Sequence, residues 1–262
     1  MNNNAIKINW ANISSEEEKL FLKLLNEYTI KSDKRYQECF TDFYEKEWIH
    51  AILDKHKYPI TDNFHLLGGY STANRVVVCI SPYEGPIDNP ISILRIDIKT
   101  GFNKALTHRD FLGSILGLGI DRSKIGDIIV TDFGAYIFVI DEIAEYIRYN
   151  LTKISRYKQI EISIINDDEL DLQPVEMTEL FTVVTSLRFD VVLCSVFRIS
   201  REKCNKLVKA ERAKLNGITV TNNSTMVKEG DTFTLRGYGK FILANIGGLS
   251  KKNKTHILVK KF

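Results

Sequence analysis

The sequence lacks any apolar run approaching the ~18 residues that a membrane-spanning helix needs. Its beginning, Met1–Asn4, has no basic residues followed by an apolar stretch, so it predicts no secretion signal. The four cysteines form no CxxC pair, and their spacing predicts neither a zinc site nor a disulfide framework. These absences predict a cytoplasmic protein with reduced thiols and no membrane partner.

Glycine-rich cofactor loops are also missing. Gly117 and Gly119 close a predicted helix instead of following a strand, and the third glycine of a dinucleotide site is absent. The triplet His-Arg-Asp at 108–110 is similar to a kinase catalytic loop, but Ile115 stands where the kinase asparagine should be and no phosphate loop precedes it. The five histidines are dispersed along the chain. We therefore expect no catalytic residue, no bound metal and no cofactor.

The two parts of the chain differ strongly in charge, although the formal net charge is only +3. Residues 1–180 contain 20 Lys and Arg against 28 Asp and Glu, whereas residues 181–262 contain 16 against 5. A basic segment of this size beside an acidic body is typical of a module that meets phosphates. A basic tail that serves only solubility is disfavoured, because the charges are interleaved with a regular apolar pattern.

The 262 residues, 44% of them hydrophobic, are enough for two or three globular domains. In the N-terminal part, Ser15 is placed to cap a helix, and a second helical stretch is predicted from Thr41 to the residues before Pro59. We predict an α+β fold with four segments: a helical N-terminal region at 1–62, a central βαββαβ domain at 63–166, an acidic linker at 167–181, and a basic domain with a basic C-terminal extension at 182–262.

The central domain has the element order of ferredoxin-like folds, which include the RRM. Its third strand is where an RRM carries a basic residue and aromatic side chains that stack on bases. The run at 131–138 keeps Phe133, Gly134 and Phe138, but it has no leading basic residue and has Ala135 in place of an aromatic residue. We therefore predict a domain that is RRM-like in shape and does not stack bases. The predicted strands are 91–98, 125–131, 135–140 and 159–165, and the predicted helices are 107–118 and 141–151.

The basic domain centres on a predicted helix at 201–210, with Ser200 as its N-cap. At helical spacing, Cys204, Leu207 and Val208 fall in one arc, so they predict the side that docks on the core. Basic residues occupy the remainder of the helix surface. The sequence therefore predicts a rod with one buried side and one side that presents cations.

Several spaced motifs in this domain look like the αL RNA-binding domain of a small-subunit ribosomal protein, tyrosyl-tRNA synthetases and many pseudouridine synthases. The motifs lie at 188–190, 200–201, 206–208, 216–217 and 227–231. One departure is Glu211, which stands where these domains usually have a glycine after the second helix, so the backbone there is strained or the turn differs. The RNA face that the resemblance implies consists of Arg188, Arg198, Ser200, Arg201, Lys203, Lys206, Lys209, Lys214 and Asn216.

Over most of its length the chain also resembles the bacterial YlmH family, in the Gly-Gly-Tyr motif at 68–70 and in the stretch 106–128. The resemblance implies a non-catalytic, monomeric protein that binds rRNA and tRNA on the large ribosomal subunit. It further implies a role in quality control of stalled chains carrying peptidyl-tRNA, partners from that pathway, and a link to cell division. The stretch 106–128 is either a structural turn or a second contact through Arg109, Arg122 and Lys124.

Two other functions remain open. The segment 187–190, Leu-Arg-Phe-Asp, is similar to the motif that contains the catalytic aspartate of pseudouridine synthases, but Leu187 replaces the preceding glycine and Val191 begins an apolar continuation. The chain could alternatively be a protein-interaction scaffold that acts through its acidic N-terminal half. A pull-down before and after nuclease treatment would separate the scaffold from an RNA-dependent assembly.

Overall fold

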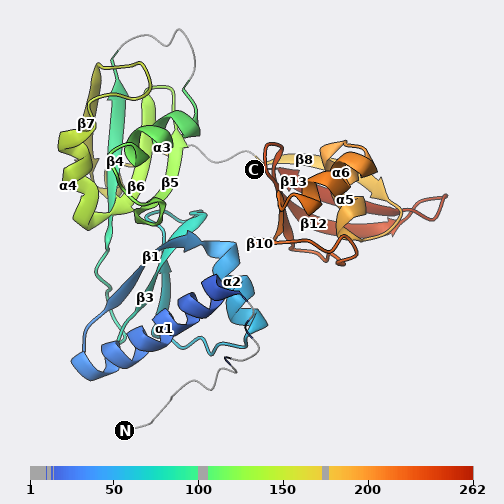
Figure 1. The fold of residues 1–262 in the computed structure, drawn as a ribbon, viewed down its shortest axis with the longest axis horizontal. Coiled ribbons are helices and arrows are strands. Elements are labelled where there is room, and N and C mark those ends of the chain that lie inside the picture. The colour runs from blue at the N-terminus through green and yellow to red at the C-terminus, as the bar shows by residue number, and fades with distance from the viewer. Residues whose placement is uncertain (1–9, 11–12, 14, 100–105, 173–176, 262) are drawn as a thin grey trace. The chain divides into compact units, whose positions relative to one another are not determined.

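The computed structural model describes Trp10, Ile13 and residues 15–99, 106–172 and 177–261. The chain divides into two compact units, which we call unit 1 (Met1–Asp171) and unit 2 (Leu172–Phe262). Both contain helices and sheets, which confirms the predicted α+β class (Figure 1). Within the described ranges, no helix has the length and apolar character needed to cross a membrane.

Unit 1 begins with a three-stranded antiparallel sheet of order β1-β3-β2, packed with two helices. Ser15 caps the first helix as predicted, because its hydroxyl accepts a hydrogen bond from the Glu18 backbone N–H at 3.3 Å. These elements are α1 (Glu16–Arg35), β1 (Cys39–Glu45), α2 (Lys46–Lys55), β2 (Phe64–Leu67) and β3 (Arg75–Ile80).

The N-terminal region is not wholly helical, and the predicted helix from Thr41 is wrong over its first turn. Residues 39–45 form strand β1, and α2 begins only at Lys46. Burial alternates along β1, with Cys39, Thr41 and Phe43 inside, which is the period of a strand. The Thr41 hydroxyl also accepts a hydrogen bond from the Val78 N–H at 3.0 Å. Pairing with β3, distant in sequence, therefore outweighs the local helical pattern.

The second part of unit 1 has the predicted βαββαβ order. Its four-stranded antiparallel sheet has the order β5-β6-β4-β7, so β6 lies between β4 and β5, and β4 lies between β6 and β7. This interleaving is the split βαβ arrangement of ferredoxin-like folds. The elements are β4 (Ile91–Ile98), α3 (His108–Leu116), η2 (Arg122–Lys124), β5 (Ile125–Val130), β6 (Gly134–Ile140), α4 (Asp141–Asn150), β7 (Ile160–Ile165) and η3 (Asp167–Glu169).

Two aromatic rings on the sheet surface that would stack bases in an RRM are buried in this chain. Phe138 has no exposed surface and Tyr136 is only 1% exposed. The Tyr70 ring lies on Phe138 with centroids 4.9 Å apart, and the Tyr70 hydroxyl donates to Asp127 Oδ2 at 2.9 Å. Gly69, at φ +79°, sits so close to Phe138 that a Cβ would lie 2.5 Å from its ring. The burial of Phe138 agrees with the prediction that this strand does not stack bases.

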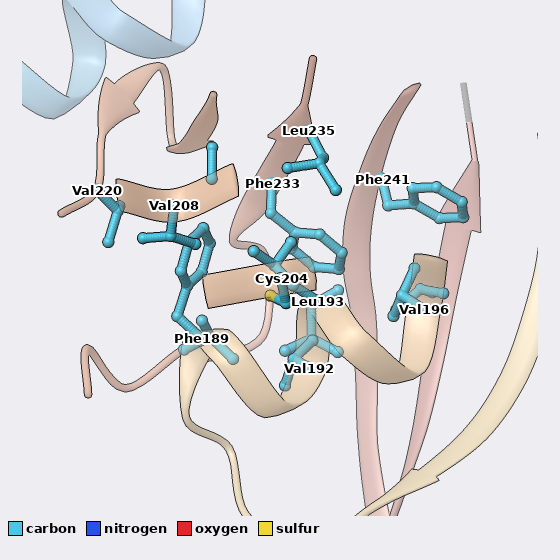
Figure 2. Close-up of a cluster of buried hydrophobic side chains, with 14 of the residues drawn as sticks. Phe189, Val192, Leu193, Val196, Cys204, Val208, Val220, Phe233, Leu235 and Phe241 are labelled. Atoms are coloured by element: carbon cyan, nitrogen blue, oxygen red, sulfur yellow. The ribbon is translucent and has the colours of Figure 1, made fainter. Parts of the chain in front are cut away.

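Unit 2 is a six-stranded antiparallel sheet of order β10-β9-β11-β12-β13-β8 with two helices packed on it. Figure 2 shows side chains from α5, α6 and the sheet meeting in one core, among them Phe189, Cys204 and Phe233. The elements are β8 (Thr178–Val184), α5 (Phe189–Phe197), α6 (Arg201–Lys209), β9 (Ala213–Leu215), β10 (Ile218–Thr219), β11 (Thr232–Leu235), β12 (Gly239–Leu249) and β13 (Thr255–Lys261).

Two parts of unit 2 differ from the sequence-based expectation. The acidic segment 167–181, predicted as a linker, ends inside strand β8, which begins at Thr178 and pairs with β13. The basic C-terminal extension, for which no strand was predicted, contains regular structure, because β12 and β13 form a long hairpin there. Strands β8 and β12 both pair with β13. Local propensity does not reveal such tertiary pairing.

Candidate nucleic-acid interface

Helix α6 carries most of the predicted RNA face. The Ser200 hydroxyl accepts a hydrogen bond from the Lys203 backbone N–H at 3.2 Å, which caps the helix as predicted. Cys204 and Val208 have no exposed surface and Leu207 is 9% exposed, so the apolar arc faces the core. The cationic residues of the other side are exposed. They are Arg201, Lys203, Lys206 and Lys209.

Two of these cations have partners on the same unit. Lys206 Nζ lies 2.6 Å from Glu202 Oε1 one helical turn away, in a pair whose side chains are both about three-quarters exposed. Such an exposed pair contributes little stability and is readily exchanged for another anion. Lys203 Nζ lies 5.3 Å from the centre of the Tyr238 ring. Sequence reasoning missed Tyr238, because nothing local places that ring beside α6.

The end of α6 shows how the chain tolerates Glu211. Its φ is +56°, the left-handed conformation that usually selects glycine. The Glu211 N–H donates to the Val208 carbonyl at 2.9 Å, and the Arg212 N–H donates to the Leu207 carbonyl at 3.0 Å. These two bonds form a Schellman motif with glutamate at the left-handed position. Of the two alternatives predicted for this position, the strained backbone is therefore the one observed.

The segment between strand β8 and helix α6 contains two more residues of the predicted RNA face. Arg188, at the N-terminus of α5, forks onto Asp190, with Nε 3.1 Å from Oδ1 and Nη2 3.0 Å from Oδ2. This contact orients the Arg188 guanidinium. Arg198 ends α5 in a left-handed conformation, with φ +52°, and its side chain is exposed. Ser200, the N-cap of α6, follows two residues later, so Arg198 lies close to the start of that helix.

The hairpin between β9 and β10 contains the last two predicted residues. Asn216 and Gly217, with φ of +49° and +76°, form the two-residue turn that the Asn-Gly pair predicts. The Asn216 side chain is committed to the fold: its Oδ1 accepts from the Thr232 N–H at 2.8 Å, and its Nδ2 donates to Asp231 Oδ1 at 2.9 Å. Lys214 lies in β9 and is half-buried. Asn216 thus stabilises the turn that follows β9, the strand that contains Lys214.

The three residues considered for a second contact, Arg109, Arg122 and Lys124, have different surroundings. The Arg122 guanidinium donates to the carbonyls of Ile125 and Gly126, and burial together with the nearby Arg75 lowers its pKa to about 10. Lys124 Nζ pairs with Asp42 Oδ1 at 2.7 Å. Arg122 therefore bonds locally to the start of β5, whereas Lys124 connects this segment to β1.

Arg109 is different, because it is exposed in the first turn of α3. It lines a groove of about 470 Å³ between α3 and the loop after α4, together with Ser114 and Lys153. The helix is capped at its start: Asp110 Oδ2 accepts from the Thr107 N–H at 2.8 Å and from its hydroxyl at 2.7 Å. Of the three residues considered for a second contact, Arg109 alone presents an exposed guanidinium.

No arrangement for metal or thiol chemistry was found in the described part of the chain. Among the described residues, no three His, Cys, Asp or Glu side chains lie close enough together to hold a metal ion. The cysteines are free thiols, and burial raises the pKa of Cys79 and of Cys204 to about 12. Thiols with such a pKa stay protonated near neutral pH and are poor nucleophiles.

Comparison with known proteins finds a family model that matches a part of each unit. Residues 86–169 match the family described as "Putative RNA-binding domain in YlmH". Residues 178–236 match the family described as "Mitochondrial transcription rescue factor 1, C-terminal domain". The first match covers the four-stranded sheet and its helices, and the second covers β8 to β11 with α5 and α6.

Two relatives were also found, one among known sequences and one among solved structures. The chain is 27% identical over 244 residues to "Ribosome-associated protein quality control protein P2" of Bacillus subtilis (strain 168), covering 92% of this chain and 94% of that protein. It is 26% identical to the solved structure of "Cell division protein ylmH from Streptococcus pneumoniae", which covers 60% of this chain and 96% of the other, with a TM-score of 0.47.

The chain is therefore an α+β protein whose first unit contains a domain of the type defined in YlmH. The match of residues 86–169 to the domain defined in YlmH agrees with the resemblance seen in the sequence.

Proposed function

We propose that the chain is a non-catalytic RNA-binding protein that uses α6 of unit 2 to bind RNA phosphates. The observation that carries the proposal is the exposed cationic side of α6, held in place by the buried Cys204, Leu207 and Val208. Arginine can fork onto phosphate oxygens, whereas lysine acts as a mobile point charge. Contacts of this kind position a protein on RNA without reading its sequence.

We further propose that the target is the large ribosomal subunit holding a peptidyl-tRNA, so that rRNA and tRNA are both partners. The name of the Bacillus subtilis relative, with its reference to ribosome-associated quality control, supports this biological setting. Charge supports a specific site over general RNA coating, because residues 1–180 carry a surplus of eight acidic groups that extended RNA repels. We propose that the protein acts in the cytoplasm as a monomer, together with other proteins of the quality-control pathway.

An RNA-modifying activity at Asp190 is the alternative enzyme function. Both carboxylate oxygens of Asp190 accept hydrogen bonds from Arg188, and the side chain is only 15% exposed. A carboxylate held in this way suits a positioning role better than attack on a base. A scaffold function of the acidic unit is compatible with RNA binding, and nuclease treatment before a pull-down separates the two.

The test is sedimentation of the full-length protein with ribosomal particles from cells with stalled translation. We expect it to co-sediment with large subunits that retain peptidyl-tRNA in preference to intact ribosomes or free rRNA. The Arg201→Ala/Lys206→Ala variant should be lost from that fraction, whereas Lys23→Ala/Lys34→Ala, which removes the same charge from exposed positions of α1, should be retained. Equal distribution of the wild type over every RNA-containing fraction would reduce the proposal to nonspecific binding.

A further inference from the structure

The β12–β13 hairpin extends beyond the rest of the unit 2 sheet (Figure 1). On one side, the last pair between β11 and β12 is Thr232 with Ile242. On the other side, the last pair between β8 and β13 is Val184 with Thr255. Residues 250–254 therefore lie past the ends of both neighbouring strands. Leu249, 69% exposed, marks the point where the hairpin leaves the core.

The tip of the hairpin is ordered by its own hydrogen bonds. The Ser250 N–H donates to the Lys254 carbonyl at 2.7 Å, and the Asn253 N–H donates to the Ser250 carbonyl at 2.9 Å. The Lys254 N–H also donates to the Ser250 hydroxyl at 3.1 Å. Asn253 adopts a left-handed conformation with φ +52°, as expected for a three-residue loop built on a type I turn. Lys251 and Lys252 are therefore the exposed central residues of a defined turn.

The charge of this hairpin is of one sign only. After Asp231 the sequence contains no acidic residue, while seven Lys and Arg follow. Across the described residues, no carboxylate forms an ion pair with Lys251, Lys252 or Lys254. Two cations of the candidate interface differ in this respect, since Lys206 pairs with Glu202 and Arg188 with Asp190. Among the residues that the structure describes, the three ammonium groups of the tip thus have no carboxylate partner.

We propose that this tip, Ser250–Lys254, is a second phosphate-binding site that contacts the backbone of RNA independently of α6. Three lysines on one rigid turn repel each other, and a polyanion relieves that repulsion. RNA fits better than a lipid surface, because the five tip residues contain no apolar side chain to insert between lipids. The proposal rests on the proposed RNA-binding function and adds a contact that extends the footprint beyond the helix surface.

The salt dependence of RNA binding by the full-length protein tests the proposal. In a plot of the logarithm of the binding constant against the logarithm of the salt concentration, each phosphate contact increases the magnitude of the slope by a roughly constant amount. The variant Lys251→Ala/Lys252→Ala/Lys254→Ala should lower the magnitude of that slope by about 2, at ~0.7–0.9 per lost contact. The control Lys23→Ala/Lys31→Ala/Lys34→Ala removes three exposed lysines from α1 and should leave the slope unchanged. The probe is purified ribosomal RNA, and thermal unfolding verifies that both variants are folded.

A slope equal to that of the wild type in the hairpin variant would overturn the proposal. The proposed function fails separately, if Arg201→Ala/Lys206→Ala binds as the wild type does. Loss of slope in the hairpin variant with no effect of the α6 variant would support the hairpin as an RNA contact and reject α6. Binding of the wild type to anionic lipid vesicles, abolished in the hairpin variant while RNA binding is unchanged, would assign the tip to a membrane surface and overturn the proposal.

Discussion

Arg188 and Asp190 form a two-point contact at the start of α5, with Nε to Oδ1 at 3.1 Å and Nη2 to Oδ2 at 3.0 Å. The geometry engages both carboxylate oxygens and holds the guanidinium in one orientation. Arg188 remains 43% exposed despite this contact, so its outer edge can meet a further anion. Asp190 is thus placed to orient the Arg188 guanidinium. Replacing Asp190 therefore distinguishes a role in RNA binding from a role in catalysis.

We predict that Asp190→Asn leaves the nucleoside composition of bound RNA unchanged, since the wild type is not expected to modify RNA. RNA affinity should fall modestly, because the freed guanidinium can adopt other orientations. Nucleoside mass spectrometry after incubation with each protein checks the first point, and a binding isotherm checks the second. Pseudouridine formed by the wild type and absent with the variant would restore the enzyme alternative.

The two sides of α6 should respond differently to truncation. Arg201→Ala/Lys206→Ala should weaken RNA binding while leaving the unfolding midpoint almost unchanged, because both side chains are exposed. Leu207→Ala, on the buried side, should lower the free energy of unfolding by about 2–5 kcal/mol. Denaturant titration and RNA binding, measured on the same samples, distinguish the two effects. Normal binding by the folded double variant would place the RNA face elsewhere.

Glu211→Gly should stabilise unit 2 by about 0.5–1 kcal/mol. The left-handed backbone costs a non-glycine residue ~1–2 kcal/mol, and part of that gain is offset by the larger entropy of glycine in the unfolded chain. Glu211→Ala is the matched control, because it removes the same charge but keeps the strained φ. If both variants were equally stabilised in thermal unfolding, charge and not backbone strain would be the cause.

Gly69→Ala should destabilise unit 1 by about 2–5 kcal/mol. The φ of +79° disfavours any side chain, and the new Cβ would lie 2.5 Å from Cδ1 of the buried Phe138. Gly113→Ala is the control: a Cβ there has nothing within 4 Å, and alanine in a helix should add about 0.5–1 kcal/mol. Chemical denaturation of both variants gives the comparison, and a neutral Gly69→Ala would mean that the Tyr70 segment moves easily.

Glu18 should give unit 1 a pH-dependent stability in the acid range. Burial alone raises the pKa of this carboxyl, but hydrogen bonds from Lys55 Nζ and His56 Nε2 outweigh burial and lower it below 4.5. The resulting stability is present above the unfolded pKa and is lost as the pH falls through the folded pKa. Glu18→Gln should therefore cost about 1–2 kcal/mol at pH 7 and progressively less below about pH 4. A difference that is constant from pH 7 to pH 3 would contradict this.

Local signals in the sequence predicted much of this structure. The Ser200 cap with its apolar arc, the Asn-Gly turn at residue 216 and the βαββαβ order all depend on neighbours a few residues apart. Strand β1 was missed because its pairing partner, β3, begins about 30 residues later at Arg75. The role of Lys124, which pairs with the distant Asp42, was not predictable for the same reason. A carbonyl or carboxylate that neutralises a cation across a fold leaves no local pattern.

The β12–β13 hairpin was also not predicted, since the glycine pair at 247–248 and the lysines at 251–254 resemble an irregular basic tail. Strand pairing nevertheless continues past the glycines, with a register shift between Ile246 and Leu249. The absence of acidic residues after Asp231 was the one signal that could have drawn attention to it.

The burial of Phe138 has a consequence for what the protein could distinguish. In an RRM, individual RNA bases stack on aromatic rings of the sheet. Here the Phe138 ring is already covered by Gly69 and Tyr70 of the same chain. Under the proposed function, this domain is therefore blind to nucleotide identity on its sheet surface. A factor that rescues stalled translation benefits from such indifference, because the obstructed chain can arise from any transcript and offers no common sequence to recognise.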